Sequence, residues 1–557
     1  MTRRAGRGGD LGQLGDLADA ESVPNEEVAA PRSRSGRLAR STAFFSAATA
    51  LSRVAGLARE ILAAGFFGVS RQMSAFTYAF AVPNLVRSLF ADAAIQAAFV
   101  PVFTEKLEAG EKREAFRLAA TLLYLVALVL ALLTTVFILL APVLMPLIAQ
   151  GFGDAGDDLT IALTQLLFPI LLLLGITGMV VGVLNSYDRF GALAIAPFFW
   201  NIAIIAVLVG FAPVVPARDE IYLYAYGVLA GTVVQLMICA YDLRNTPFRL
   251  LRVFDWRSPG VRRVLLLMLP VTISLGLINF NLLINAIFGG LLSDPDIRNL
   301  GAKAPAAIDK AFRIYMLPQG IFSVAVTTVL FPTLARYAAR RDYDDLRATM
   351  ANGMRQILLL LIPAAAAILV LSEPMTRIVY ERGDFGETGT DLVSTALFWF
   401  AFSLPFNGLF LLLTRTFFSL QRPWVPTVIS GLNLAVTALF CLLFYKPFGV
   451  GGIVAATAIA TLASVVAQAV VLRRQLGRLE LDRLLRTTAQ ITIAAGALAI
   501  TSYSVWVLLD EILGRSLVAQ VIAIGFGLIS GAVIYGVAIT LQRVPEAEQI
   551  WRVVRRR

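Results

Sequence analysis

Charged side chains stand inside a long apolar run near the start of this sequence. The segment LSRVAGLARE, residues 51–60, places Arg53, Arg59 and Glu60 between the stretches STAFFSAATA and ILAAGFFG. A charge at the centre of a bilayer costs at least roughly 2.5–3.5 kcal/mol, so charges kept there usually have a function. On a straight helix Arg53 and Glu60 share a face roughly 10 Å apart, and Arg59 lies about 120° around from Arg53. Arg53 and Arg59 can therefore line one site only if the helix bends near Gly56 or the site is wide.

Later apolar blocks carry further polar side chains of the same kind. Asn84 and Arg87 lie one turn apart in the second block, with Asp92 after them, and Arg313 lies in the eighth block, one turn after Asp309. Interhelical ion pairing or snorkelling to an interface explains any single arginine.

The four arginines considered together favour a different interpretation. The carboxylates of Glu60, Asp92 and Asp309 do not obviously neutralise all of them if they share one site. A net positive central cavity binds an anion, and the planar, always charged guanidinium suits phosphate. The residues therefore predict transport of a phosphate-bearing or otherwise acidic substrate, and they do not distinguish phosphate from carboxylate.

Uncharged polar residues form a second group of candidates. Asn433 and Thr437 of the eleventh block share a helix face, which makes their oxygens candidate ion ligands. Ordinary interhelical packing is the simpler interpretation of that pair. Asn281 and Asn285 of the seventh block either hydrogen-bond between helices or line the cavity.

Several kinds of chemistry have no residues to support them. The sequence has no histidine, which excludes imidazole metal ligands and His-based proton relays or nucleophile pairs. Its two cysteines, Cys239 and Cys441, fall in apolar blocks and read as small buried hydrophobes. No GxxxxGK[ST] pattern, carboxylate pair or metal cluster stands out. We therefore expect a transporter, not an enzyme, with no metal site and no cofactor, coupled to a monovalent cation or to the membrane potential.

The composition indicates that these residues lie in membrane spans. The chain has 557 residues, 58% of them hydrophobic and 15% charged, against about 25% charged in a soluble domain. The apolar residues gather in about fourteen blocks long enough to cross a bilayer, which predicts an all-α polytopic membrane protein. The blocks fall near 42–68, 74–103, 117–149, 158–184, 192–213, 220–241, 263–292, 306–337, 354–372, 390–420, 425–445, 449–472, 487–509 and 516–541.

The basic residues orient these spans. Lysine and arginine gather in alternate loops, whereas the loops between them, such as GFGDAGDD, are poor in both. By the positive-inside rule both termini lie in the cytoplasm. This accounts for the net charge of +11 without a nucleic-acid partner. Residues 1–40 read as a disordered cytoplasmic tail and 546–557 as a basic cytoplasmic tail.

A weak internal repeat divides the membrane part. In the second block Pro83-Asn84 precedes Pro101, and in the eighth Pro318-Gln319 precedes Pro332, each with small residues between. Repeated halves with Pro-interrupted spans are typical of transporters, whose site lies between the halves. We predict an N-lobe of six helices at 41–245, a C-lobe of six at 246–475 and two extra helices at 476–545.

The motifs SRVAGLARE, PNLVRSLFADAAIQAAFVPVF, LNSYDRF, RIYMLPQGIFSVA and RGDF resemble the MurJ (MviN) lipid II flippase family. The resemblance covers about residues 41–540. It places the chain in the multidrug/oligosaccharidyl-lipid/polysaccharide exporter superfamily. It implies fourteen spans, two lobes around a central cavity, and a groove for the lipid tail at the last two spans.

The resemblance also implies roles for particular residues. The family's cavity arginines match Arg53, Arg59, Arg87 and Arg313, its asparagine after the proline matches Asn84, and Glu60 stands where the family often has aspartate. Two departures are visible. Ser74 replaces a frequent aspartate, and Asn433 and Thr437 stand where some members have a sodium-binding pattern with a carboxylate, which puts sodium coupling in doubt.

The implied activity is movement of lipid II, the undecaprenyl-diphosphate-linked peptidoglycan precursor, across the bacterial cytoplasmic membrane by alternating access. Its expected partners are lipid II and membrane lipids, with cell-wall synthesis enzymes as further candidates. The alternatives are a flippase for another polyprenyl-linked glycan and a cation-coupled multidrug exporter. The exporter predicts an acidic, aromatic-lined cavity, against which the arginines argue.

Overall fold

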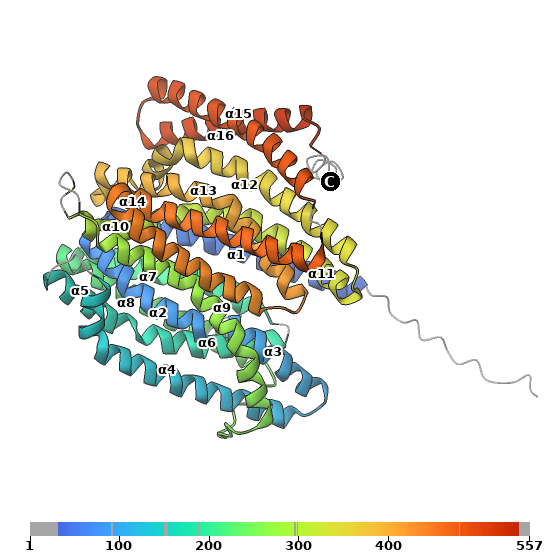
Figure 1. Ribbon diagram of the computed structural model, residues 1–557. Coiled ribbons are helices and arrows are strands. Elements are labelled where there is room, and N and C mark those ends of the chain that lie inside the picture. Colours follow the sequence, from blue (N-terminus) through green and yellow to red (C-terminus); the bar gives the residue numbers. More distant parts are fainter. Residues whose placement is uncertain are drawn as a thin grey trace, which may run out of the picture.

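The computed structural model is a bundle of long helices (Figure 1). It describes residues 32–90, 93–149, 154–187, 189–293, 297, 299–477 and 480–544. Within these ranges the regular structure is entirely helical. The predicted all-α membrane architecture is confirmed, because in hydrocarbon a helix satisfies its own backbone hydrogen bonds.

The helices follow the apolar blocks of the sequence in order. Their bounds are α1 Arg32–Phe67, α2 Arg71–Phe90, α3 Ala93–Glu108, α4 Lys112–Ile148, α5 Asp154–Leu167, α6 Pro169–Ser186, α7 Gly191–Phe211, α8 Glu220–Leu243, α9 Pro259–Gly290, α10 Leu300–Pro318, α11 Val324–Arg340, α12 Tyr343–Tyr380, α13 Gly386–Ser419, α14 Trp424–Leu476, α15 Leu481–Leu513 and α16 Leu517–Leu541. Short turns are η1 Ala212–Val214, η2 Ala217–Asp219, η3 Gln319–Ser323 and η4 Gly383–Phe385.

The helix count is consistent with the predicted number of spans. Among the described residues, 10 helical segments are long and apolar enough to cross a membrane. One of them, α14, contains two predicted spans, since Gly449 breaks its helical backbone with φ 55° and ψ −136°. Another runs through α10, η3 and α11, where η3 is a π-helical turn. Such turns are frequent at functional sites.

The N-terminal boundary differs from the prediction. Helix α1 begins at Arg32, so residues 32–40, which we expected to be disordered, are helical. Leucine, alanine and arginine in RLAR are good helix formers, which lets the first span extend beyond its apolar part. Residues 1–31 and the basic tail 546–557 lie outside the described residues, and their predicted disorder and location stay predictions.

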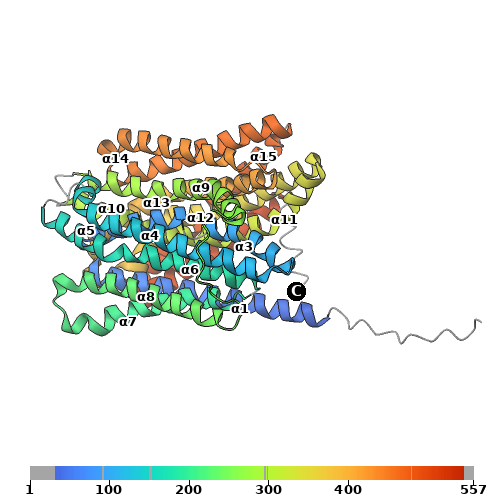
Figure 2. The same cartoon turned by 90° about the horizontal axis from the view of Figure 1, so that it is seen from below.

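Helix packing builds two neighbouring groups. In the first, α1 packs on α7, α2 on α5, and α6 on α8. In the second, α9 packs on α14, and α13 on α10 and α12. Contacts of α2 with α9 and α10, and of α1 with η4, join the groups, while α15 and α16 pack on each other and on α12 (Figures 1 and 2). The residue limits of the lobes stay predictions.

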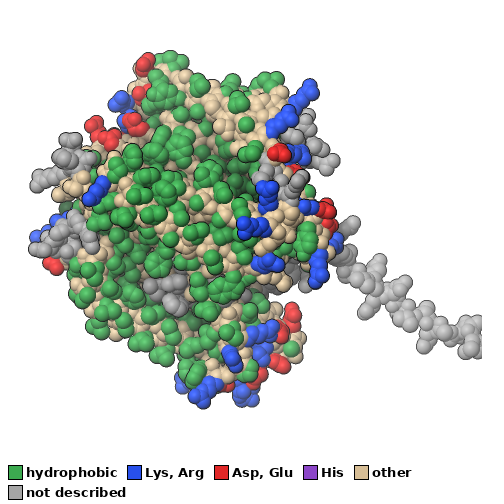
Figure 3. All heavy atoms as spheres, viewed as in Figure 1, with side chains coloured by type: hydrophobic (Ala, Val, Ile, Leu, Met, Phe, Trp, Pro, Cys, Tyr) green, Lys and Arg blue, Asp and Glu red, His purple; other side chains and the backbone are tan. Residues whose placement is uncertain are grey.

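The surface matches a membrane protein. Hydrophobic side chains cover most of the face seen in Figure 3, and lysine and arginine gather along the edge where α1 begins and α16 ends. Exposed apolar side chains such as Leu139, Ile500 and Leu541 would be costly in water and suit lipid.

Candidate functional site

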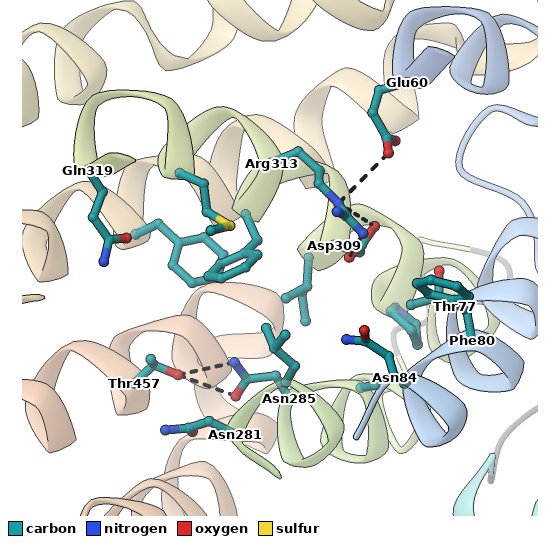
Figure 4. Close-up of a pocket in the computed structure, with 18 of the residues that line it drawn as sticks. Glu60, Thr77, Phe80, Asn84, Asn281, Asn285, Asp309, Arg313, Gln319 and Thr457 are labelled. Carbon is teal, nitrogen blue, oxygen red and sulfur yellow. Dashed lines mark hydrogen bonds and ion pairs between the residues drawn. The ribbon is translucent and has the colours of Figure 1, made fainter. Parts of the chain in front are cut away.

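A cavity of about 580 Å³ lies where the two helix groups meet. Apolar and polar side chains from α1, α2, α7, α8, α9, α10, η3, α13 and α14 line it. Its charged lining comes from α1 and α10, and its amides come from α2, α9, η3, α13 and α14 (Figure 4). Of the predicted site residues, Arg59, Glu60, Asn84, Arg313 and Asn433 line this cavity.

Arg59 and Glu60 form a buried ion pair on α1. The Nη2 of Arg59 donates to Oε1 of Glu60, and the two residues are 8% and 6% exposed. The Arg59 guanidinium also lies 4.7 Å from the ring centroid of Trp200 on α7. Its Nε and Oε2 of Glu60 are buried without a hydrogen-bond partner among the described residues. Ring and carboxylate hold the guanidinium at the cavity wall.

Arg313 brings the second helix group to the same carboxylate. Its Nη2 lies 3.3 Å from Oδ1 of Asp309, one turn earlier on α10, and its Nε lies 3.9 Å from Oε1 of Glu60. Figure 4 shows this side chain between the two carboxylates. Glu60 therefore links an arginine of α1 to an arginine of α10.

The charges of the cavity lining pair with each other. Arg59 and Arg313 are the cationic lining residues among those described, and Glu60 and Asp309 balance them. Lys310, buried on the same helix as Arg313, adds a further cation, so the expected excess of positive charge stays a prediction. The sequence did not reveal that Glu60 reaches Arg313, because that contact depends on how the bundle places α1 relative to α10.

The structure places only one of the other two predicted arginines. Arg53 is exposed and is not among the cavity-lining residues; its guanidinium lies against Gly320 of η3, where an added Cβ would come within 3.3 Å of Nη1. Arg87 is on α2, and its side chain lies outside the described residues, as does Asp92. Helix α1 runs unbroken through Gly56, which faces Asn201. Arg53 and Arg59 thus diverge.

The opposite wall is an amide network. The side-chain nitrogen of Asn281 donates to Oδ1 of Asn433 over 2.6 Å, and the Asn433 nitrogen donates to Ser464 over 2.9 Å. Asn285 and Thr457 hydrogen-bond to each other at 3.2 Å. Asn281 and Asn285 therefore both hydrogen-bond between helices and line the cavity. Thr437 is fully buried, lies outside the cavity lining, and its Oγ1 has no partner among the described residues.

Contacts between the helix groups lie beside the cavity. Tyr78 of α2 donates to the Ala286 carbonyl of α9, and the Ala306 amide of α10 donates to Ser74 over 3.2 Å. At the end of α1, Gly68 has φ 53°, and a Cβ there would overlap the Asp384 carbonyl. The close approach of backbones requires glycine at this position.

Sequence reasoning missed Trp200, Thr457 and above all Lys310. Lys310 is 0% exposed on α10 and neighbours Asp309 and Arg313. A lysine in an apolar block was a visible signal, but it lay near the start of the block, where snorkelling is the ordinary explanation.

Fold and cavity together define a class: a multi-pass helical membrane protein with a central cavity between two helix groups, as in transporters. The family model described as lipid II flippase MurJ matches residues 63–526. The chain belongs to the lipid II flippase MurJ family.

Individual relatives agree. A Rhizobium meliloti protein named a probable lipid II flippase MurJ is 34% identical over 429 residues, covering 76% of this chain and 78% of the relative. The Burkholderia cenocepacia lipid II flippase MurJ is 31% identical over 416 residues, covering 73% and 78%.

Solved structures share the fold. A lipid II flippase MurJ in an inward closed conformation has a TM-score of 0.73 at 20% identity, covering 89% of this chain and 98% of that one. An inward-facing multidrug resistance MATE transporter of the MOP superfamily has a TM-score of 0.64 at 16% identity, covering 78% and 96%.

Proposed function

We propose that this chain moves lipid II from the inner to the outer leaflet of the bacterial cytoplasmic membrane by alternating access. Family membership supports this function. The observation that carries the mechanism is that Arg59 and Arg313, from two helix groups, reach the same Glu60 beside a central cavity. The basic edge near both described chain ends supports a cytoplasmic location for both termini.

The arginines suit a diphosphate. Phosphate oxygens accept bidentate hydrogen bonds from guanidinium. Arg59 is held flat by Trp200 and still has a buried Nε without a partner among the described residues. Arg53 at η3 and Arg87 on α2 are proposed to guide the headgroup, and Asn84 to hydrogen-bond its sugars.

Alternating access requires one end to be closed. The contacts Tyr78–Ala286, Ser74–Ala306 and Gly68–Asp384 are proposed to close the end opposite the basic edge, which is the outer end in the proposed orientation. The molecule is thus proposed to receive lipid II from the cytoplasmic side. Breaking those contacts while the cytoplasmic ends close would expose the cavity outward.

The lipid tail needs an apolar path. Helices α15 and α16 lie outside the cavity against α12 and carry exposed apolar side chains, among them Ile493, Ile512 and Phe526. We propose that the polyprenyl chain follows this pair or the surrounding lipid while the headgroup crosses. Membrane lipids and cell-wall synthesis enzymes remain candidate partners.

We propose no coupling ion for transport. The Asn433 oxygen that a cation would use accepts a hydrogen bond from Asn281, and no group of three or more acidic or cysteine side chains is arranged for a metal ion among the described residues. A cation at Asn433 and Thr437 requires that bond to break. The membrane potential is the simpler proposed source, and no cofactor is proposed.

A leaflet assay tests the function. In cells depleted of their own flippase and supplied with this chain, lipid II should reach the outer leaflet, and Arg59→Ala or Arg313→Ala should abolish the rescue while the protein stays inserted. Full activity of both variants would overturn the proposed role of the arginines. Accumulation of a different polyprenyl-linked glycan on depletion would instead identify another substrate.

A further inference from the structure

Lys310 is a buried cation that the proposed capture of the headgroup does not use. It is 0% exposed on α10, and its Nζ has no hydrogen-bond partner among the described residues. It lies 5.2 Å from the ring centroid of Tyr380 on α12, whose hydroxyl donates to the Lys310 carbonyl over 3.2 Å. A buried ammonium without a hydrogen-bond partner is unfavourable unless another state offers it one.

Glu60 has a buried oxygen that could accept a hydrogen bond from the Lys310 ammonium. Its Oε1 receives Arg59 and lies near Arg313, while its Oε2 is buried without a partner among the described residues. Lys310 and Arg313 are three residues apart on α10, which makes them neighbours on the helix surface. Since Arg313 reaches Glu60, Lys310 lies one helical turn from a residue at that carboxylate.

Headgroup binding changes the partners of Glu60. In the proposed function, on which this inference rests, Arg59 and Arg313 turn their guanidinium groups to the diphosphate. Glu60 would then be a buried carboxylate without a counter-charge, which is strongly unfavourable. Within the described part of the cluster, Lys310 is the cation not already paired with a carboxylate.

We propose that Lys310 is a positioning residue that takes Glu60 from Arg59 when the lipid diphosphate binds. The exchange keeps Glu60 neutralised and frees Arg59 for the substrate. Because Glu60 is on α1 and Lys310 on α10, the exchange keeps a link between the two helix groups when Arg313 turns from Glu60 to the diphosphate. Substrate binding and the relative position of the groups are thereby coupled.

The test is a double-mutant cycle on lipid II affinity with the purified full chain. Lys310→Met should weaken lipid II binding about tenfold, equivalent to ~1.4 kcal/mol. Glu60→Gln should not weaken it, because Arg59 no longer has a competing carboxylate. Glu60→Gln with Lys310→Met should bind like Glu60→Gln alone. Without lipid II, Lys310→Met should melt at the same or a higher temperature, since it removes a buried unpaired charge.

Lys446→Met is the matched control. Lys446 lies 5.8 Å from the Tyr445 ring but is exposed on α14 and outside the cavity lining, so its loss should leave affinity unchanged. If Lys310→Met fails to fold, Lys310→Gln replaces it in the same cycle.

Two outcomes overturn the exchange alone. In the first, Lys310→Met leaves affinity unchanged while Arg59→Ala weakens it. In the second, Lys310→Met weakens binding by the same factor in the native chain and in the Glu60→Gln background, which would mean that Lys310 contacts the substrate or only packs. Wild-type affinity in Arg59→Ala contradicts the proposed capture of the headgroup, and the exchange with it.

Discussion

The two walls of the cavity bury different kinds of polar side chain. The wall of α1 and α10 holds charges, with Arg59, Glu60, Asp309 and Arg313 in contact. The wall of α9 and α14 holds neutral amides and hydroxyls, as in Asn281–Asn433 and Asn285–Thr457. Both bury polar groups between helices.

The two walls differ in whether the buried groups that lack hydrogen-bond partners are charged or neutral. On the amide wall most groups bond to each other, and such interhelical bonds contribute only about 0.6 kcal/mol each on average. On the charged wall, Arg59 Nε and Glu60 Oε2 are buried without partners among the described residues, as is Nζ of Lys310, which lies outside the lining. On the amide wall the same holds for the neutral Oδ1 of Asn281. We infer that the charged wall reorganises when substrate binds, and that the amide wall holds the helices together.

The largest effect is expected for Arg59→Ala. It removes a proposed phosphate ligand and leaves Glu60 with Arg313 at 3.9 Å as its nearest described cation. Breaking a buried pair costs about 3–5 kcal/mol, so transport should be lost and the melting temperature should fall. Complementation and thermal unfolding measure the two effects. Arg117→Ala, which removes an exposed pair with Glu114, is the control and should change neither.

Arg59→Ala with Glu60→Gln separates stability from transport. Removing both charges removes the uncompensated carboxylate, so the melting temperature should return most of the way toward the parent value. Transport should remain absent, because the guanidinium is still missing. Recovery of transport in the double variant would show that Arg59 serves only to neutralise Glu60.

An intermediate effect is expected for Arg53→Ala. Arg53 is exposed beside Gly320 and outside the cavity lining, so its loss should slow transport less than loss of Arg59 does and should leave thermal stability unchanged. Initial rates of lipid II appearance in the outer leaflet measure this. A loss as complete as that of Arg59→Ala would place Arg53 in the charged wall during transport.

The smallest effect is expected on the amide wall. Asn285→Ala removes the bond to Thr457 and should lower stability by about 0.6 kcal/mol, with an upper bound near 1.7 kcal/mol. Transport should fall severalfold at most. Abolished transport in a stably folded Asn285→Ala would contradict the division of roles between the walls. Dependence of the remaining transport on sodium would instead support an ion site there.

Most of the fold was predictable because it depends on local pattern. Apolar blocks of bilayer length must be helical, and the break at Gly449 falls at the first residue of the predicted block 449–472, next to the gap after 425–445. The start of α1 at Arg32 was not predicted, because hydropathy marks the membrane part of a helix and is silent on how far the helix continues beyond it.

The site was predictable in its residue types and only partly in its arrangement. By itself the sequence determined that arginines, carboxylates and asparagines stand inside membrane spans, since that depends only on composition and spacing. The tertiary structure alone decided that Arg59 faces the cavity while Arg53 does not, that Glu60 reaches Arg313, and that Lys310 is buried beside them. These contacts join helices far apart in the chain, so they are set by how the bundle places α1 relative to α10 and not by any local sequence pattern.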